Sequence, residues 1–255
     1  MILAALLPFA GCGSPEDRVL EETFEQLYTI EPTANLTVRN QDGAILIYGS
    51  NVDQIRVQAI KRAYTRERLR QIAIAVSVKA GSASIDTRFP PKQSWGLFDR
   101  SGTVDYTIVF PASATISQLN LDAGEVILDG LRGSTARARV GNGRMFAHNC
   151  FTNIDLAMQH GRLTLSYDWW EQGKFSAHAN LVQGNAWAFL PSAAAFHIVA
   201  ETAHGKIVND FANPVVARPT STEGMKIDSL VNGGGETTIR MRVERGNIKI
   251  VEANP

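Results

Sequence analysis

The sequence predicts an all-β protein built as a solenoid, because glycines recur at a nearly constant interval and apolar residues alternate with polar ones around each glycine. Between residues 124 and 205, successive glycines of this kind lie 18 to 23 residues apart, about the length of one solenoid coil. The wider intervals elsewhere are close to twice that length, so single coils there lack the glycine. The repeated glycines are Gly43, Gly81, Gly124, Gly143, Gly161, Gly184, Gly205 and Gly246.

The alternation around these glycines predicts strands with one buried face. A strand places successive side chains on opposite faces, so every second residue is apolar where one face is buried. The second and fourth residues after the glycines are apolar at 15 of 16 positions, and the third and fifth residues before them at 14 of 16. A two-residue period that keeps its phase over eight units indicates strands rather than helices.

Each glycine is predicted to close one strand and open the next across a turn. The preceding residue is Asp, Asn or His in several units, as at Asp42, Asn142 and His160, and these residues tolerate left-handed backbone. Such a turn fits either a solenoid corner or an antiparallel hairpin. The interval of about 20 residues favours the solenoid, because stacked repeats bury equal positions above one another. An antiparallel β-sandwich or barrel of hairpins is the alternative.

The N-terminus reads as an export signal. Residues 1–10 are almost wholly apolar but too few for a membrane-spanning helix, which needs about 20 residues. The run closes on Phe9, Ala10, Gly11 and Cys12, which resembles the bacterial lipobox and implies that Cys12 carries a lipid anchor. A plain cleaved signal is the alternative. We therefore expect a signal segment over residues 1–12, a tether over 13–30 and a single β-solenoid domain over 31–255.

Charge and cysteine content restrict the classes of partner. The 25 Lys and Arg residues balance 25 Asp and Glu residues, so the basic excess typical of nucleic-acid binding is missing. Besides Cys12 the sequence holds only Cys150, which we expect to be a small buried side chain rather than a metal ligand. The sequence has no phosphate-binding loop, nucleophile elbow or zinc-ligand spacing, so we expect no cofactor and no metal.

Several stretches resemble a known family. Leu36–Gly49, Val104–Pro111 and the later units in which Asn or His precedes the glycine are similar to the putative adhesin family DUF4097, also called the toast-rack domain. The resemblance covers about residues 24 to 253. It implies a right-handed β-helix-like solenoid, exported to the bacterial envelope and often found on lipoproteins. The family's activity is largely unestablished.

Equal positions of neighbouring coils are expected to stack into rows on the outer surface. The third residue after the glycine gives an apolar and aromatic row, and the first gives a flanking row rich in cations. An exposed tryptophan offers about 150–250 Å² of surface, so the aromatic row is expected to be covered by the same chain or a second protomer, or to bind an anionic glycan or partner. The aromatic row is Ile127, Phe146, Thr164, Trp187 and Val208, and the flanking row is Glu125, Arg144, Arg162, Asn185 and Lys206.

Two aromatic loops are further candidates for sugar stacking. Trp169 and Trp170 lie in the longest regular interval between glycines, and Trp95 lies in a second loop of the same kind. The alternative for the first pair is that one tryptophan covers the end of the core while the other rests on the surface.

A catalytic site is not expected. Asp155 beside His178 is the best acid–base pair, but glycan-cleaving enzymes need two or three carboxylates on one face. No second carboxylate shares that row, and Arg137 is expected to form an ion pair with Asp155.

The sequence therefore favours a non-catalytic, lipid-anchored protein of the cell envelope, in the outer membrane or periplasm, that acts as an adhesin-like binding or scaffolding module. A partner protein in envelope-stress sensing and a polysaccharide-active enzyme on a β-helix are the alternatives. The expected partners are the membrane, through the lipid, and an envelope glycan or protein. Residues 19–33 and Lys249–Val251 are expected to cap the solenoid.

Overall fold

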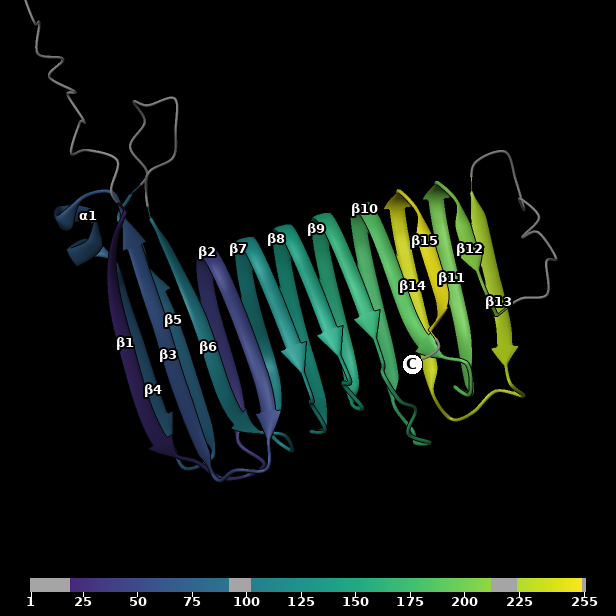
Figure 1. The fold of residues 1–255 in the computed structure, drawn as a ribbon, viewed down its shortest axis with the longest axis horizontal. Coiled ribbons are helices and arrows are strands. Elements are labelled where there is room, and N and C mark those ends of the chain that lie inside the picture. Colours follow the sequence, from purple (N-terminus) through teal and green to yellow (C-terminus); the bar gives the residue numbers. More distant parts are fainter. Residues whose placement is uncertain (1–18, 92–101, 212–223, 254–255) are drawn as a thin grey trace, which may run out of the picture.

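The computed structural model describes residues 19–91, 102–211 and 224–253, and within these ranges the chain is an all-β solenoid-like fold. Its strands form one open, hydrogen-bonded network that does not close on itself, and Figure 1 shows them side by side along the long axis of the molecule. One short helix, α1 (Arg66–Gln71), lies at the end near β1. No helix in the described part of the chain is long and apolar enough to cross a membrane.

The strands, in chain order, are β1 (Leu20–Thr29), β2 (Asn35–Ser50), β3 (Gln54–Ala63), β4 (Ala73–Lys79), β5 (Ser82–Arg88), β6 (Thr103–Pro111), β7 (Thr115–Asp129), β8 (Thr135–His148), β9 (Asn153–Ser166), β10 (Ser176–Pro191), β11 (Phe196–His204), β12 (Ile207–Asn209), β13 (Met225–Val231), β14 (Thr238–Arg245) and β15 (Ile248–Ala253).

Five long parallel strands form the repeat, and each one belongs to two layers. In β2, β7, β8, β9 and β10 the residues before the central glycine pair with one another, and so do the residues after it. The halves before the glycine, together with β4, β5, β14, β11 and β13, make up layer 1. The halves after the glycine, together with β1, β3, β6, β15 and β12, make up layer 2.

Five of the repeated glycines occupy bends inside continuous strands, which corrects the prediction that every glycine separates two strands: Gly43, Gly124, Gly143, Gly161 and Gly184. Gly205 and Gly246 do separate two strands as predicted, β11 from β12 and β14 from β15. Gly143 lies opposite Gly124 and Gly161 in register, with φ 131°, and the strand hydrogen bonding runs through it. A Cβ atom at Gly143 would lie 1.9 Å from the carbonyl oxygen of Gly124. Only glycine fits where neighbouring backbones come this close. Gly81 also separates two strands, because it lies in the antiparallel turn between β4 and β5.

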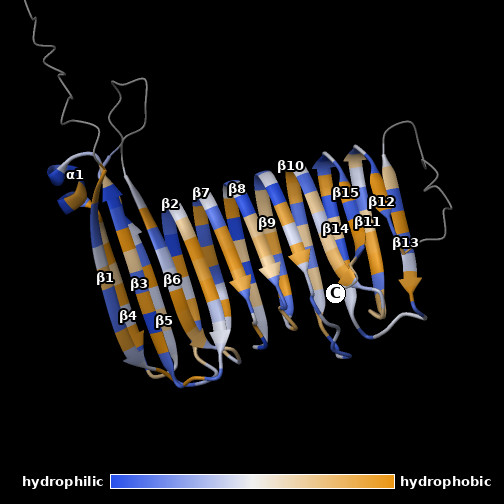
Figure 2. Ribbon diagram, in the orientation of Figure 1, coloured by the Kyte–Doolittle hydropathy of each residue, from blue (hydrophilic) through white to orange (hydrophobic). Residues whose placement is uncertain are grey.

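The alternating positions form the core between the two layers, as the sequence predicted. Figure 2 shows apolar and polar residues alternating along the strands, and the buried apolar side chains make one cluster. Asn40 and Thr202 occupy predicted core positions and are polar, so each needs a hydrogen-bond partner. Asn40 Nδ2 donates to the carbonyl of Val104 at 2.8 Å, and Thr202 Oγ1 donates to that of Gly246 at 2.8 Å.

Coil order in space differs from coil order in the sequence at both ends of the stack. β2 lies between β7 and the coil made by β5 and β6, and the coil made by β14 and β15 lies between β10 and the coil of β11 and β12. Lys249–Val251 is therefore inside the stack rather than a terminal cap. The end strands β1, β4 and β13 pair antiparallel with their neighbours.

The structure has a strand where the sequence analysis predicted part of a tether. Residues 20–29, which we assigned to a spacer, form β1 and pair with β3 along the whole length of both strands. Phe24 and Tyr28 pack against the core from this strand, and Lys61 Nζ lies 2.6 Å from Glu22 Oε1. The spacer therefore does not extend over residues 20–29.

Candidate functional site

The predicted aromatic row lies on the outer face of layer 2, with two additional members, Leu46 and Lys249. Residues paired in register across the layer run Leu46, Ile127, Phe146, Thr164, Trp187, Lys249 and Val208. The sequence placed Trp187 beside Val208, whereas the insertion of β15 puts Lys249 between them. Phe146 and Trp187 are half-buried and flank the buried Thr164.

A second outward row, which the sequence analysis missed, adds aromatic residues to this face. It consists of the fifth residue after each glycine and includes Tyr48, Asp129, His148, Ser166 and Phe189. The Phe146 and His148 rings stack with centroids 5.6 Å apart, and Trp187 meets Phe189 edge to face at 6.1 Å. Extending the sequence alignment to the fifth residue after each glycine would have identified this row. We call Phe146, His148, Trp187 and Phe189 the aromatic stripe.

The predicted cationic side chains lie beside this stripe and differ in the groups that they contact. The guanidinium carbon of Arg162 lies 4.4 Å from the centroid of the Trp187 ring, a cation–π contact. Arg144 forms an ion pair with Glu125 at 3.4 Å. Lys206 is exposed just before β12, and its backbone N–H donates to Asn247 at 2.9 Å. The positive charge near the stripe therefore comes mainly from Arg162, from Lys249 beside Trp187, and from Lys206 two strands away.

His148 connects the stripe to the loop that follows β9. Its Nδ1 lies 3.0 Å from Asp129 Oδ1, and its Nε2 lies 2.9 Å from Asp168 Oδ2. Asn149, in left-handed backbone with φ 48°, donates to the same Asp168 oxygen at 3.3 Å. Hydrogen bonding from His148, and then from Asn149, lowers the pKa of Asp168 below its ordinary value. The loop is thus held against the solenoid by polar contacts.

The two adjacent tryptophans of that loop have different environments. Trp170 packs on Tyr167, Phe175 and Phe196 with centroid distances of 5.5, 5.7 and 5.7 Å, so it covers the end of the core. Trp169 is 47% exposed and donates from Nε1 to Glu171 at 2.9 Å. This arrangement agrees with the alternative in which one tryptophan covers the core and the other lies on the surface.

An arginine fixes the position of the exposed Trp169. Arg132 donates to Glu171 Oε1 at 2.7 Å and also to Oε2, and its guanidinium lies 5.1 Å from the centroid of Phe151. The hydrogen bond from Arg132 lowers the pKa of Glu171. Phe151 in turn touches Trp169 with a centroid distance of 5.8 Å.

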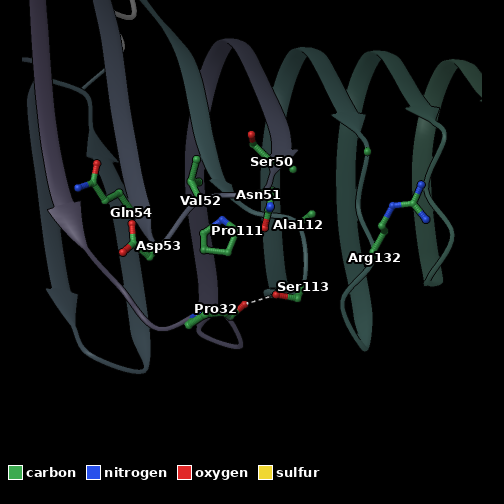
Figure 3. Close-up of a pocket in the computed structure, with 12 residues that line it drawn as sticks. Pro32, Ser50, Asn51, Val52, Asp53, Gln54, Pro111, Ala112, Ser113 and Arg132 are labelled. Carbon is green, nitrogen blue, oxygen red and sulfur yellow. Dashed lines mark hydrogen bonds between the residues drawn. The ribbon is translucent and has the colours of Figure 1, made fainter.

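Arg132 also borders an open hollow at the loop edge of the molecule. The hollow, about 900 Å³, is lined by loop residues that include Pro32, Asn51, Asp53 and Ser113, and Figure 3 shows these side chains around it. Ser113 Oγ donates to the carbonyl of Pro32 at 2.7 Å. Its polar groups are dispersed around a wide opening, so the hollow offers no constellation for chemistry.

The remaining candidates do not form a reactive centre. Asp155 and His178 are register neighbours on the outer face of layer 1, and the predicted ion pair of Arg137 with Asp155 is not among those formed by the described residues. Cys150 is buried as expected, and burial raises the pKa of its thiol to about 12. No group of three His, Cys, Asp or Glu residues in the described ranges could hold a metal ion. Cys12 and the loop around Trp95 lie outside those ranges.

Comparison with known proteins supports the fold. The structure is similar to the crystal structure of a putative cell adhesion protein from Clostridium sporogenes, with a TM-score of 0.51 and 15% sequence identity over 91% of this chain and 100% of that one. It also matches a putative adhesin from Bacteroides fragilis, with a TM-score of 0.28 and 12% identity over 90% and 97% of the two chains. No protein-family model and no curated protein matches the sequence. At 15% identity, the similarity to the Clostridium protein shows a shared fold.

Proposed function

We propose that the protein is a non-catalytic, adhesin-like binding module of the bacterial cell envelope, and that its aromatic stripe binds a glycan. The observation that carries this proposal is the stripe itself, whose Phe146 and Trp187 rings face outward from layer 2. These residues lie two strands apart, so the sheet spacing fixes them about 10 Å from each other. Two outward aromatic rings at a constant separation suit contact with an extended chain of sugar rings.

The cations beside the stripe support an anionic ligand. The guanidinium of Arg162 lies over the Trp187 ring, so a sugar that packs at the edge of this ring would meet a positive charge. Lys249, between Trp187 and Val208, adds a second charge in the same row. We therefore infer that the preferred glycan carries carboxylate or phosphate groups.

Membership of the DUF4097 family and attachment through a lipid at Cys12 are parts of the same proposal. The lipobox-like residues before Cys12 support the anchor, and the fold shared with a protein named as a putative cell adhesion protein supports the adhesin-like role. Both point to a protein exported to the envelope. A stress-sensing partner protein and a polysaccharide-active enzyme are the alternatives, and the release of free sugars distinguishes the enzyme.

The test compares glycan retention by the immobilised full chain and by a Phe146→Ser, Trp187→Ser double variant, using solubilised envelope polysaccharide. We expect the variant to lose at least about tenfold in affinity, since each lost ring contact contributes roughly 0.5–1.5 kcal/mol beyond its buried area. A Leu27→Ser, Leu230→Ser variant removes exposed apolar surface elsewhere and should bind as the wild type does, because these side chains are 58% and 65% exposed on β1 and β13.

Three outcomes contradict the proposal. Equal retention by the wild type and the stripe variant would assign the stripe a structural role, most clearly if the variant also melts at a lower temperature. If neither protein retains polysaccharide, the protein does not bind the envelope glycan. Release of free sugars from the polysaccharide would indicate an enzyme instead of a binding module.

A further inference from the structure

The outer face of layer 1 carries four exposed arginines that form no salt bridge with another described residue. Arg137 and Arg139 lie on β8, and Arg240 and Arg242 lie on β14. None of the four takes part in the salt bridges of the described residues. On layer 2, Arg62 and Arg144 each contact a carboxylate. Asp228, two strands from Arg240, interacts with its charge but forms its ion pair with His197. The four guanidinium groups therefore keep hydrogen-bonding capacity for a ligand.

Parallel register aligns these arginines into two rows that run across the strands. Four neighbouring strands carry Arg137, Asp155, His178 and Arg240 in one row, and Arg139, Ala157, Asn180 and Arg242 in the other. β8 and β14 are three strands apart, so the sheet spacing separates the two arginine pairs by about 14 Å. We call these eight residues the arginine platform.

The platform is positive although the whole chain has no net charge. It holds four arginines and one carboxylate, Asp155, and two further carboxylates border it: Glu201 lies opposite Arg242 on β11, and Glu244 lies two residues beyond Arg242 on the same face. The second row continues through Asn120 to Arg39, five strand spacings or about 24 Å from β14. Positive groups therefore recur along a straight line perpendicular to the strands.

We propose that this face binds a linear acidic polysaccharide that lies across the strands. Guanidinium groups form two parallel hydrogen bonds to a carboxylate, which an ammonium group cannot do in the same geometry. His178 and Asn180, between the two arginine pairs, can hydrogen-bond to sugar hydroxyls. The proposal does not depend on the aromatic stripe, because the platform lies on layer 1 and the stripe on layer 2.

The composition of the platform argues against other polyanions. Single-stranded nucleic acids are bound through aromatic side chains on which bases stack, and the eight residues include no Phe, Tyr or Trp. Stable binding to an anionic bilayer combines basic residues with apolar side chains that enter the lipid, and the platform has no large apolar side chain. A polymer of hydroxyl and carboxylate groups matches the residues that are present.

The experiment measures binding of polygalacturonate to the full chain by titration calorimetry at low and moderate salt. An Arg139→Gln, Arg242→Gln variant should lose at least about tenfold in affinity, because charge-assisted hydrogen bonds are lost at two positions. Lysine at the same two positions should restore part of that affinity, because it keeps the charge without the planar fork. The control is Arg66→Gln, Arg70→Gln on α1, which removes the same charge from another part of the molecule and should bind as the wild type does.

Distinct results would overturn the proposal. If the control variant loses as much affinity as the platform variant, binding of polygalacturonate depends only on the net charge of the protein. Equal binding by the wild type and the platform variant would place the polymer elsewhere. If phosphatidylglycerol vesicles or single-stranded DNA bind through the arginines while polygalacturonate does not, the platform serves another class of polyanion. A melting temperature equal to that of the wild type confirms that the variants are folded, as expected for exposed side chains.

Discussion

Replacing Gly143 by alanine should destabilise the solenoid severely, because the glycines at the bends are stacked directly on one another. The new Cβ atom would lie 1.9 Å from the carbonyl oxygen of Gly124, whereas ordinary contacts begin near 3.4 Å. The strands β7 and β8 would have to separate locally by about 1.5 Å, enough to break the hydrogen bonds between them. The backbone at this position also has φ 131°, which L-residues with a side chain rarely adopt.

The size of the effect follows from these two contributions. Overpacking of a tight site costs about 1–3 kcal/mol, and an unfavourable backbone conformation costs about 1–3 kcal/mol more, so the variant should lose at least about 2 kcal/mol. For a chain of this length that corresponds to a fall of at least about 4 °C in the melting temperature.

Thermal unfolding followed by circular dichroism is the assay, with Gly173→Ala as the matched control. The nearest atom to a Cβ at Gly173 is Cδ1 of Phe175 at 4.0 Å, so this variant should stay within about 0.5 kcal/mol of the wild type. If Gly143→Ala and Gly173→Ala melt at the same temperature, the close stacking of the bends does not limit the sequence and our reasoning is wrong.

Three further predictions test the loop and the core. Trp170→Ala should cost about 3 kcal/mol in chemical denaturation and Trp169→Ala less than about 1 kcal/mol, because only Trp170 packs on the core; equal costs would contradict that assignment. Cys150 should not react with iodoacetamide at neutral pH unless the chain unfolds, since its pKa is raised to about 12; modification of Cys150 in the native chain, located by peptide mass spectrometry, would disprove this. The depressed pKa values of Asp168 and Glu171 mean that their stabilisation is complete above the ordinary carboxyl pKa and is lost as the pH falls through the folded-state values. Trp169 emission should therefore be constant from neutral pH to about 4.5 and change only below it, whereas a change nearer neutrality would rule out these carboxylates as the cause.

The core of the protein was accessible from the sequence because burial in a strand follows a strict two-residue period. The positions around Gly124, Gly143, Gly161 and Gly184 face inward as the alternation predicted, and the parallel register brings these glycines opposite one another. The bend was misread as a turn because a local sequence does not reveal the neighbouring backbone that requires glycine. The tight contact is a property of the stack, and it exists only when the coils are assembled.

The arrangement of the outer rows was harder to predict, because it depends on which coils are neighbours. Alignment on the glycines assumed that coils stack in chain order, and this holds from β7 to β10. It fails beyond β10, where β15 brings Lys249 beside Trp187, and β14 brings Arg240 beside His178. The arginine platform exists only because of this second juxtaposition. No local pattern encodes it, since strand choice depends on the packing of the whole stack.

The exchanged order of the end coils also explains how the stack ends without further growth. A parallel solenoid with a bare terminal coil offers unpaired N–H and C=O groups to another copy, which favours aggregation. Here the chain closes layer 2 at one end with the antiparallel strand β1, which bears Glu21, Glu22 and Glu25, and layer 1 at the other with β13, where Asp228 is bound to His197 at 2.7 Å. Charged side chains and reversed strand direction at these edges oppose the addition of a further parallel coil. The two wide outer faces, rather than the ends, are therefore the surfaces that this fold leaves open for binding.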